Sequence, residues 1–305
     1  MSWLIVGEGA LSGLITAEMA SQGLPYYVKT RGQAARPLAY CNRQQQWLPS
    51  FQPETWRGEP VSTIFAAIKA YQVSDFIAEW RTWEVSTVPL ILSYNGMLLD
   101  EQQLLPDVTA HLVCTTAAER IRADDFDRLS YHGSGLNNLG WALPSAARAH
   151  DSEGQQAELL ATLERTLAPV HWVDNIRQLR WEKLAINCLI NPFTVIYRCR
   201  NGRLAELNLE QRQQQLAAEI VLLARQFGVT LELENLLKKT QYIIAQTASN
   251  RSSTLVDVLS GRPTEMDYLT GFVVAQSERC GLAAPHHQLL LEQFYQSLTA
   301  PADPQ

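Results

Sequence analysis

The sequence has little that would indicate a disulfide-stabilised, metal-binding, membrane or nucleic-acid-binding protein. Its five cysteines show no C-x-x-C spacing, and its six histidines do not combine with them in a zinc pattern. No apolar run approaches the ~18 residues that a membrane span needs, and the first residues lack the basic start of a secretion signal. The net charge of −6 argues against nucleic acid as the main partner. We therefore expect a cytoplasmic protein with no metal, membrane or nucleic-acid partner.

What is present is the composition of a globular protein with two domains. The 305 residues are 46% hydrophobic and 18% charged, and a chain of this length exceeds one ordinary core. Strand signals are confined to the first part and fade from about residue 173 onward. We expect an α/β domain over residues 1–172 and an all-α domain over residues 173–305. The polar segment 150–156 predicts a loop, and the tail 300–305 predicts a frayed end.

A glycine-rich turn follows the first predicted strand, at residues 2–6. The turn and the start of the next helix read Gly7-Glu8-Gly9-Ala10-Leu11-Ser12-Gly13. A second strand is predicted at residues 26–30, and this strand–turn–helix–strand order is typical of a dinucleotide-binding unit. Its glycines permit a tight turn and let backbone N–H groups approach a pyrophosphate. Ser12 stands where the third glycine is usual, so a turn with only a structural role stays open as the alternative.

An arginine, Arg31, lies just past the second predicted strand. An NAD-binding domain carries an acid near this position, which holds the ribose 2′-hydroxyl. Arginine can instead pair with the 2′-phosphate of NADP(H), and Lys29 adds positive charge nearby. The alternative is an ordinary solvated arginine. The position favours NADP(H) over NAD(H).

Two polar residues follow later strands. Strands are predicted at residues 62–68, 88–93 and 110–115, as in an open, mostly parallel sheet. Lys69 directly follows the first of these strands, and Asn95 lies two residues past the second. Both therefore belong to the carboxyl edge of the sheet, where such sheets bind ligands. The alternatives are a solvated lysine and a turn-forming Asn-Gly pair.

The second half has the pattern of amphipathic helices, which are predicted at residues 178–191, 207–227, 233–249, 264–279 and 285–298. In the first of them, Lys183, Asn187 and Asn191 recur every four residues and share one stripe. The other faces are apolar, which suits a helix buried on nearly all sides. A lysine there is costly unless an anionic group or a ligand meets it. The stripe therefore predicts a site with donors for a carbonyl or carboxylate group.

Two further residues are open to a structural interpretation. Glu265 follows Thr264, which together with Asp267 forms a capping-box-like helix start. An acid in a first helical turn, favoured by the helix dipole, is the simpler interpretation of Glu265. Ser253 lies in a polar run where turn or cap chemistry is the default.

Together these motifs resemble those of the ketopantoate reductase (2-dehydropantoate 2-reductase) family, through nearly the whole chain. The matching segments are Gly7-Glu8-Gly9-Ala10-Leu11, Arg31, Ile68-Lys69-Ala70-Tyr71-Gln72-Val73, Asn95-Gly96-Met97, Trp181-Glu182-Lys183-Leu184-Ala185-Ile186-Asn187, Asn191-Pro192 and Glu265-Met266-Asp267-Tyr268. The lysine–asparagine–asparagine helix and the Glu-x-Asp-Tyr segment are specific, whereas many dehydrogenases share the glycine turn. The resemblance implies a Rossmann-type α/β N-terminal domain and an all-α C-terminal domain, with catalysis in the cleft between them.

The resemblance also implies a reaction, the NADPH-dependent reduction of ketopantoate to pantoate on the route to pantothenate. It makes Lys183 the general acid that protonates the carbonyl oxygen, and Glu265 a residue that contacts the cofactor and orients the reacting groups. The implied substrate-binding residues are Asn95, Asn187, Asn191, Asn201 and Ser253. The implied cofactor-binding residues are Gly7, Glu8, Gly9, Ala10, Leu11, Ser12, Arg31, Lys69, Asn95, Ala118 and Glu265.

Three departures from the family pattern leave alternatives open. Ser12 replaces the third glycine, Leu98 stands where a small residue usually follows Asn-Gly-Met, and residues 115–135, which include Ala118, match poorly. The alternatives are a reductase of another 2-oxo acid and a non-catalytic NADPH-binding sensor on the same fold. A dehydrogenase of hydroxy acids or amino-acid derivatives is less favoured, since no histidine lies in a convincing motif. The expected partner is a small 2-oxo acid, and the expected state is a monomer or a homodimer.

Overall fold

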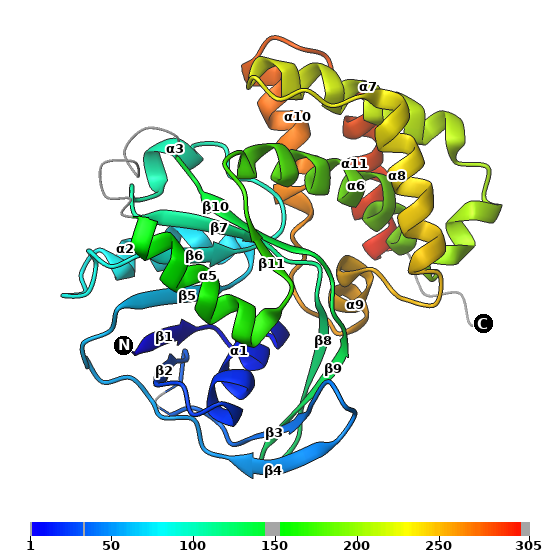
Figure 1. Ribbon diagram of the computed structural model, residues 1–305. Helices are drawn as coiled ribbons and strands as arrows, with labels where there is room; N and C mark the ends of the chain where they lie inside the picture. The colour runs from blue at the N-terminus through cyan, green and yellow to red at the C-terminus, as the bar shows by residue number, and fades with distance from the viewer. Residues whose placement is uncertain (1, 33, 144–152, 300–305) are drawn as a thin grey trace. The chain divides into compact units, whose positions relative to one another are not determined.

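The computed structural model describes residues 2–32, 34–143 and 153–299 (Figure 1). Internal contacts distinguish two units: unit 1 comprises Met1–Tyr94 and Gln102–Ile176, and unit 2 comprises Asn95–Glu101 and Arg177–Gln305. From the sequence we predict a domain boundary after residue 172, and this boundary stays a prediction. The two units meet along the chain after Ile176. The predicted frayed tail lies outside the described residues, as does the predicted loop up to residue 152. Residues 153–156 are helical, so the loop prediction was wrong there.

The apolar runs of the first half form a seven-stranded sheet, called sheet A here. Neighbouring strands run parallel except β10 and β7, so the predicted mostly parallel sheet is confirmed. Strands such as β1 are buried at every position because helices cover both faces of the sheet. Across the sheet the order is β11 (Val170–Trp172), β10 (Asn137–Trp141), β7 (Thr109–Val113), β6 (Leu90–Ser93), β5 (Thr63–Ala67), β1 (Trp3–Val6) and β2 (Tyr26–Lys29).

Two strand–helix–strand units leave the centre of sheet A in opposite directions. The chain runs from β1 through α1 (Ala10–Ser21) to β2, and from β5 through α2 (Val73–Trp80) to β6 on the other side. Because such crossovers are right-handed, the two helices cover opposite faces of the sheet. The adjacent strands β1 and β5 are therefore the switch point of the topology. Doubly wound sheets bind their ligands beyond the carboxyl ends of the strands at this point.

A second sheet of four strands, called sheet B here, was missed by the sequence analysis. Helix α1 packs against β1, β2 and β5 of sheet A and also against β3, β8 and β9 of sheet B (Figure 1). This explains why residues Ser12–Met19 of α1 are buried on every side of the helix. Across sheet B the order is β4 (Trp47–Phe51), β3 (Leu38–Cys41), β9 (Asp127–Gly133) and β8 (Ala117–Arg122).

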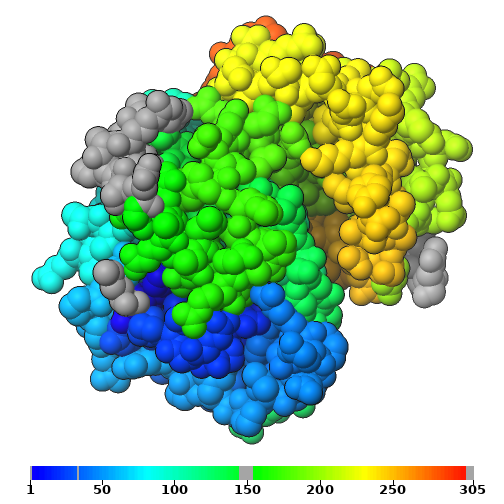
Figure 2. Space-filling view, in the orientation of Figure 1, coloured from blue at the N-terminus to red at the C-terminus, as the bar shows by residue number. Residues whose placement is uncertain are grey.

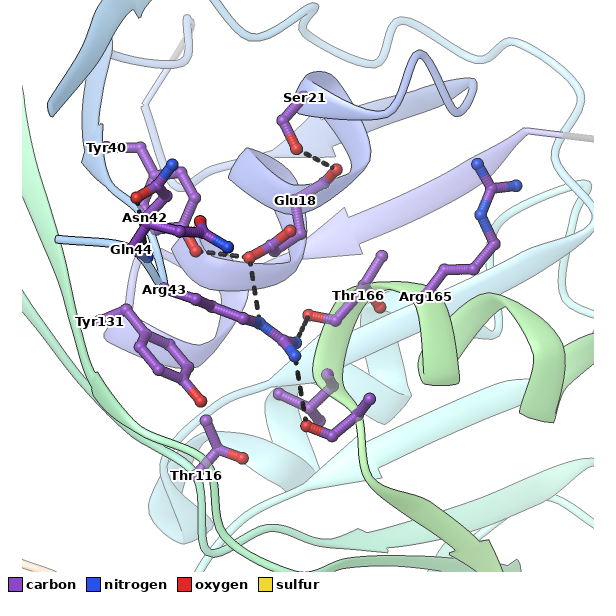
Figure 3. Close-up of polar contacts among 12 residues, drawn as sticks. Glu18, Ser21, Tyr40, Asn42, Arg43, Gln44, Thr116, Tyr131, Arg165 and Thr166 are labelled. Atoms are coloured by element: carbon purple, nitrogen blue, oxygen red, sulfur yellow. Dashed lines mark hydrogen bonds and ion pairs between the residues drawn. The ribbon is translucent and has the colours of Figure 1, made fainter. Parts of the chain in front are cut away.

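A buried polar cluster joins α1 to sheet B and to α5 (Glu153–Leu167) (Figure 3). Helix α5 packs on α1 and lies on the surface of unit 1 (Figure 2). The Glu18 carboxylate accepts a hydrogen bond of 2.5 Å from the Tyr40 hydroxyl and lies 3.6 Å from Nε of Arg43. The Arg43 guanidinium also donates to the carbonyl oxygens of Thr166, at 3.2 Å, and Ala168, at 3.5 Å. Arg43 thus satisfies carbonyl groups at the C-terminal end of α5. Burial and the bond to Glu18 raise the pKa of the Tyr40 hydroxyl well above its ordinary value.

Unit 2 is helical in the part that follows Ile176, as predicted. The buried core gathers apolar side chains from α6, α7, α8 and α10, and includes Met97 from the short segment Asn95–Glu101. Helix α9 was missed, because the polar run before it was assigned to turn or cap chemistry. The helices are α6 (Ile176–Ile196), α7 (Glu210–Gln226), α8 (Leu233–Gln246), α9 (Ser253–Leu259), α10 (Thr270–Arg279) and α11 (Pro285–Thr299), with 3-10 turns η2 (Asn201–Glu206) and η3 (Met266–Tyr268).

Helix α6 is longer than the prediction of residues 178–191, which ended it before Pro192. The structure continues the helix through Pro192 to Ile196. Proline cannot donate the hydrogen bond to the carbonyl of Cys188, so the helix loses one backbone bond there. The residues after the proline compensate by packing, since Phe193 is fully buried and Val195 is 2% exposed.

A buried acid–imidazole pair holds the N-terminus of α11. The Glu219 carboxylate of α7 accepts hydrogen bonds from the backbone N–H groups of His286, at 2.9 Å, and His287, at 3.0 Å. It also lies 2.6 Å from Nδ1 of the fully buried His287 ring. Burial lowers the pKa of His287 from its ordinary value of 6.5 and outweighs the opposing contact with Glu219. The neutral ring therefore donates Nδ1–H to the carboxylate.

This pair predicts that the stability of the fold falls on acidification. Because the pKa of His287 is lower in the folded chain, the unfolded chain takes up the proton first, and stability is lost as the pH falls below about 6.5. The three hydrogen bonds outweigh burial and lower the pKa of Glu219, which adds a further loss below about 4.5. We expect the free energy of unfolding, measured by urea titration, to fall by up to about 1.4 kcal/mol per pH unit between pH 6.5 and 5.

Two substitutions separate the buried ring from its neighbour. His287→Gln should remove most of this dependence between pH 6.5 and 5, whereas His286→Gln should keep it, because His286 is only partly buried. An unchanged pH dependence in His287→Gln would assign it to other groups.

Candidate functional site

The glycine turn of unit 1 fits a close approach of a ligand to the backbone. Gly7 has φ +111°, and a Cβ atom there would lie 2.6 Å from the carbonyl oxygen of Ala67, so only glycine is accommodated. Gly9 is the N-cap of α1, and a Cβ at Gly9 would meet nothing within 4 Å. Glu8 and Gly9 are exposed, and Ala10 and Leu11 open the first helical turn. The N–H groups of such a turn have no intrahelical acceptor and favour an anionic group.

Ser12, the departure from the glycine pattern, lies under this turn. It is 1% exposed, and its hydroxyl lies 3.0 Å from the carbonyl oxygen of Val6 and 3.3 Å from that of Ala67. These carbonyls are at the ends of β1 and β5, the two strands at the switch point. The serine side chain therefore ties the two strand ends together below Gly7.

The cationic residues named by the sequence follow the ends of neighbouring strands. Val6 at the end of β1 pairs with Lys29 of β2 and with Ala66 of β5, so these strands end at one edge of sheet A. Arg31 is exposed two residues past β2, and Lys69 is partly buried two residues past β5. Both residues thus follow the carboxyl edge at the switch point.

Lys29 has a different environment from Arg31. Its ammonium lies 3.0 Å from the Glu79 carboxylate and 5.3 Å and 5.9 Å from the ring centres of Trp83 and Trp56. The carboxylate and the aromatic faces offset its charge. Ala118 is partly buried in β8 of sheet B and packs against the core of unit 1.

The polar stripe of α6 is present in unit 2. Lys183 and Asn187 are partly buried, and Asn191 is 6% exposed. The Asn191 amide donates to the hydroxyl of Thr254 at 3.2 Å, which joins α6 to the first turn of α9. Ser253 is exposed in this same turn, which is capped by Ser252. The structure therefore brings Asn191 and Ser253 to one end of α9.

Asn201 reaches the same part of unit 2 from η2. Its backbone N–H donates to the carbonyl of Asn250 at 3.0 Å, and its amide donates to the hydroxyl of Thr247 at 2.8 Å. The side chain is 7% exposed, and its oxygen Oδ1 has no hydrogen-bond partner among the described residues. A buried amide oxygen without a donor is costly, so a donor from outside the described residues would be favoured there.

Glu265 and Asn95, which are 170 residues apart in the chain, meet in unit 2. The Asn95 amide donates to the Glu265 carboxylate at 3.1 Å, and Glu265 is 4% exposed. The helix predicted to begin at residue 264 begins instead at Thr270, and a 3-10 turn precedes it. The interpretation of Thr264 as the cap of that helix was therefore wrong. Its hydroxyl accepts from the N–H of Met266, at 3.4 Å, which belongs to the 3-10 turn.

The described parts of the chain hold no side-chain cluster suited to a metal ion and no helix suited to crossing a membrane. Across residues 2–32, 34–143 and 153–299, His, Cys, Asp and Glu side chains form no group of three or more that could hold a metal ion. Over the same ranges, each helix is too short or too polar to cross a membrane.

Comparisons with known proteins place this chain among oxidoreductases. A 2-dehydropantoate 2-reductase of Yersinia pestis is 32% identical over 230 residues, which are 75% of this chain and 72% of the relative. The chain belongs to the ketopantoate reductase family. The family profile described as "Ketopantoate reductase PanE/ApbA C terminal" matches residues 175–296. A 2-dehydropantoate 2-reductase of Escherichia coli O157:H7 is 29% identical and covers 96% of this chain and 93% of its own length. The resemblance proposed from the motifs is thus confirmed.

Solved structures confirm the fold of this ketopantoate reductase family member. A PanE/ApbA family ketopantoate reductase from Ralstonia eutropha JMP134 superposes with a TM-score of 0.79 at 19% identity, over 97% of this chain and 98% of the other. A D-mandelate dehydrogenase with NADH and anilino(oxo)acetate gives a TM-score of 0.82 at 16% identity, over 98% of each chain. The α/β unit and the helical part that follows it are therefore the fold of this family.

Proposed function

We propose that this chain is an NADPH-dependent reductase of a 2-oxo acid, with ketopantoate as its substrate. The observation that carries the proposal is the stripe of one ammonium and two carboxamides on α6, within the region matched by the family profile. Its relatives of about 30% identity are 2-dehydropantoate 2-reductases. We further propose that the enzyme is cytoplasmic and that it is a monomer or a homodimer. A ketopantoate reductase from Staphylococcus aureus is described as dimeric.

The glycine turn and the cations after β2 and β5 suit a dinucleotide. Residues Gly7 to Ser12 would hold the pyrophosphate through backbone N–H groups at the start of α1. Arg31 would pair with the 2′-phosphate, and Lys69 would add charge on the ribose side. In our proposal Ala118 is a further cofactor contact. The bound NADPH would supply a hydride to the carbonyl carbon of the substrate.

Lys183 supplies the proton in the proposed mechanism. Its ammonium donates a hydrogen bond to the substrate's carbonyl oxygen and transfers a proton to it as negative charge develops, so hydride and proton together give the alcohol. Asn95, Asn187, Asn191, Asn201 and Ser253 would orient the substrate's hydroxyl and carboxylate groups. Glu265, which accepts a hydrogen bond from Asn95, would fix that amide and contact the cofactor.

A panel of 2-oxo acids, assayed with NADPH and with NADH, tests the proposal. We expect oxidation of NADPH with ketopantoate, and much slower oxidation of NADH, because NADH lacks the 2′-phosphate with which Arg31 would pair. Turnover of an aromatic or a shorter 2-oxo acid, but not of ketopantoate, would assign the chain to a sister reductase. That outcome has a structural rationale, since Leu98 is 9% exposed where the family usually has a smaller residue.

A sensor without catalytic activity is the second candidate. Titration of NADPH fluorescence would show binding without turnover of any acid in the panel if this candidate is correct. A protein that neither binds NADPH nor turns over any acid would refute both candidates.

A further inference from the structure

The segment Asn95–Glu101 belongs with unit 2 although the chain on both sides of it belongs to unit 1. It begins with Asn95, whose amide donates to Glu265, and it ends at Glu101. Fixing each residue of the segment costs roughly 1–2 kcal/mol of conformational entropy, so specific contacts with unit 2 are needed to hold it in place. The contacts that hold the segment therefore determine where the Asn95 side chain lies.

Backbone contacts with η3 fix the middle of the segment. The Met97 N–H donates to the carbonyl oxygen of Tyr268 at 2.9 Å. Gly96 has φ +79°, and a Cβ atom there would lie 2.2 Å from the same carbonyl oxygen. The segment thus lies against the backbone of η3, and the Met97 side chain is 5% exposed in the core of unit 2.

Arg180 of α6 holds the same segment from a second side. Its guanidinium contacts both carboxylate oxygens of Glu101, at 2.6 Å and 2.7 Å, and donates to the carbonyl oxygen of Gly96 at 3.3 Å. The residue is 9% exposed, so this two-pronged ion pair is largely removed from water. A planar guanidinium binds a carboxylate in one orientation, which a lysine or an apolar side chain cannot do.

The position of Arg180 on its helix connects this contact to the proposed active site. Arg180 lies three residues before Lys183, and residues three apart are neighbours on a helix surface. We propose that Arg180, acting through Glu101 and Gly96, is a positioning residue that sets the Asn95 amide relative to the Lys183 ammonium. The consequence for catalysis rests on the proposed function, whereas the placement of the segment does not.

Hydrogen exchange of the segment tests the placement directly, without any substrate. In Arg180→Met we expect the amide of Met97 to exchange about ten-fold faster or more, with little change in the helices of the unit 2 core. Arg180→Lys should show a smaller increase, because it keeps the charge and loses the two-pronged geometry. Glu101→Gln keeps the shape of the side chain and removes its charge, so its increase in exchange rate should be similar to that of Arg180→Lys. This variant replaces Arg180→Met in the test if Arg180→Met does not fold.

Arg279→Met provides a matched control on the same segment. Arg279 pairs with Asp100 at 2.8 Å, but both side chains are largely exposed, so this pair should contribute little to the placement. If Arg180→Met and Glu101→Gln accelerate exchange no more than Arg279→Met, the inference is overturned.

Kinetics then test the link to catalysis. We expect Arg180→Lys and Glu101→Gln to lower kcat by about ten-fold or more with little change in NADPH affinity, because a displaced amide no longer orients the substrate. Faster exchange with unchanged kcat would refute the catalytic part of the inference. Faster exchange in a chain that turns over no 2-oxo acid would leave the placement standing and would refute the proposed function instead.

Discussion

Replacing Lys183 with alanine is expected to lower kcat for the 2-oxo acid by about 10²-fold or more. The proposed mechanism needs a proton at the carbonyl oxygen as the hydride arrives, and general acids of this kind contribute about 10²–10⁴-fold. Alanine leaves no donor at this position of α6, and it is the best helix former, so the helix should persist. The measurement is steady-state turnover at saturating NADPH, with circular dichroism to verify the fold.

Lys239→Ala is the control for the loss of a lysine from unit 2. The Lys239 ammonium pairs with Glu182 at 2.6 Å, and its side chain is 52% exposed, so this variant should keep near wild-type turnover. If Lys183→Ala also keeps near wild-type turnover, Lys183 is not the proton donor. Partial recovery of Lys183→Ala activity with added methylammonium would support the assignment further.

Gly96→Ala is expected to cause the second large effect, on both stability and activity. The new Cβ would lie 2.2 Å from the Tyr268 carbonyl oxygen, and φ +79° is unfavourable for alanine. The backbone must shift, and we expect the free energy of unfolding to fall by about 2–4 kcal/mol, the sum of backbone strain and overpacking. Since the shift would also move Asn95, kcat/KM should fall. Urea titration and steady-state kinetics measure the two effects.

Gly228→Ala isolates the contribution of backbone strain. Gly228 has φ +67°, close to that of Gly96, but a Cβ atom there would meet nothing within 4 Å. This variant should lose only about 1 kcal/mol and keep its activity. Equal losses in the two variants would show that contact with Tyr268 contributes nothing.

The sequence predicted those elements whose signal is local. The strands β1, β2, β5, β6 and β7 are short apolar runs bounded by turns, and the helices of unit 2 show three- and four-residue apolar spacing. The two edge strands of sheet B have no comparable signal, since most residues of β8 (Ala-Ala-Glu-Arg-Ile-Arg) are exposed and Pro49 lies within β4. Strand β3 (Leu-Ala-Tyr-Cys) is a short apolar run that was overlooked. Helix α1 packs against β3, β8 and β9, and no local pattern contains these contacts.

The contacts of the candidate site were less predictable than its residues. The family resemblance named Asn95 and Glu265, but the hydrogen bond between them joins segments 170 residues apart. Arg180 was not singled out, although a second cation three residues before Lys183 in a buried helix was a visible signal. Pro192 predicts the end of a helix, but α6 continues through it to Ile196, because the buried residues after the proline offset the lost backbone hydrogen bond.

The grouping of Asn95–Glu101 with unit 2 has a consequence for dissecting this protein into fragments. The chain passes from one unit to the other three times, after Tyr94, after Glu101 and after Ile176. A fragment that begins at Arg177 would leave the place of Met97 in its core empty and the Arg180 guanidinium without its carboxylate. Proteolytic cleavage after Ile176 would therefore release a destabilised helical fragment. A circularly permuted chain would need to keep the seven residues Asn95–Glu101 together with the helices of unit 2.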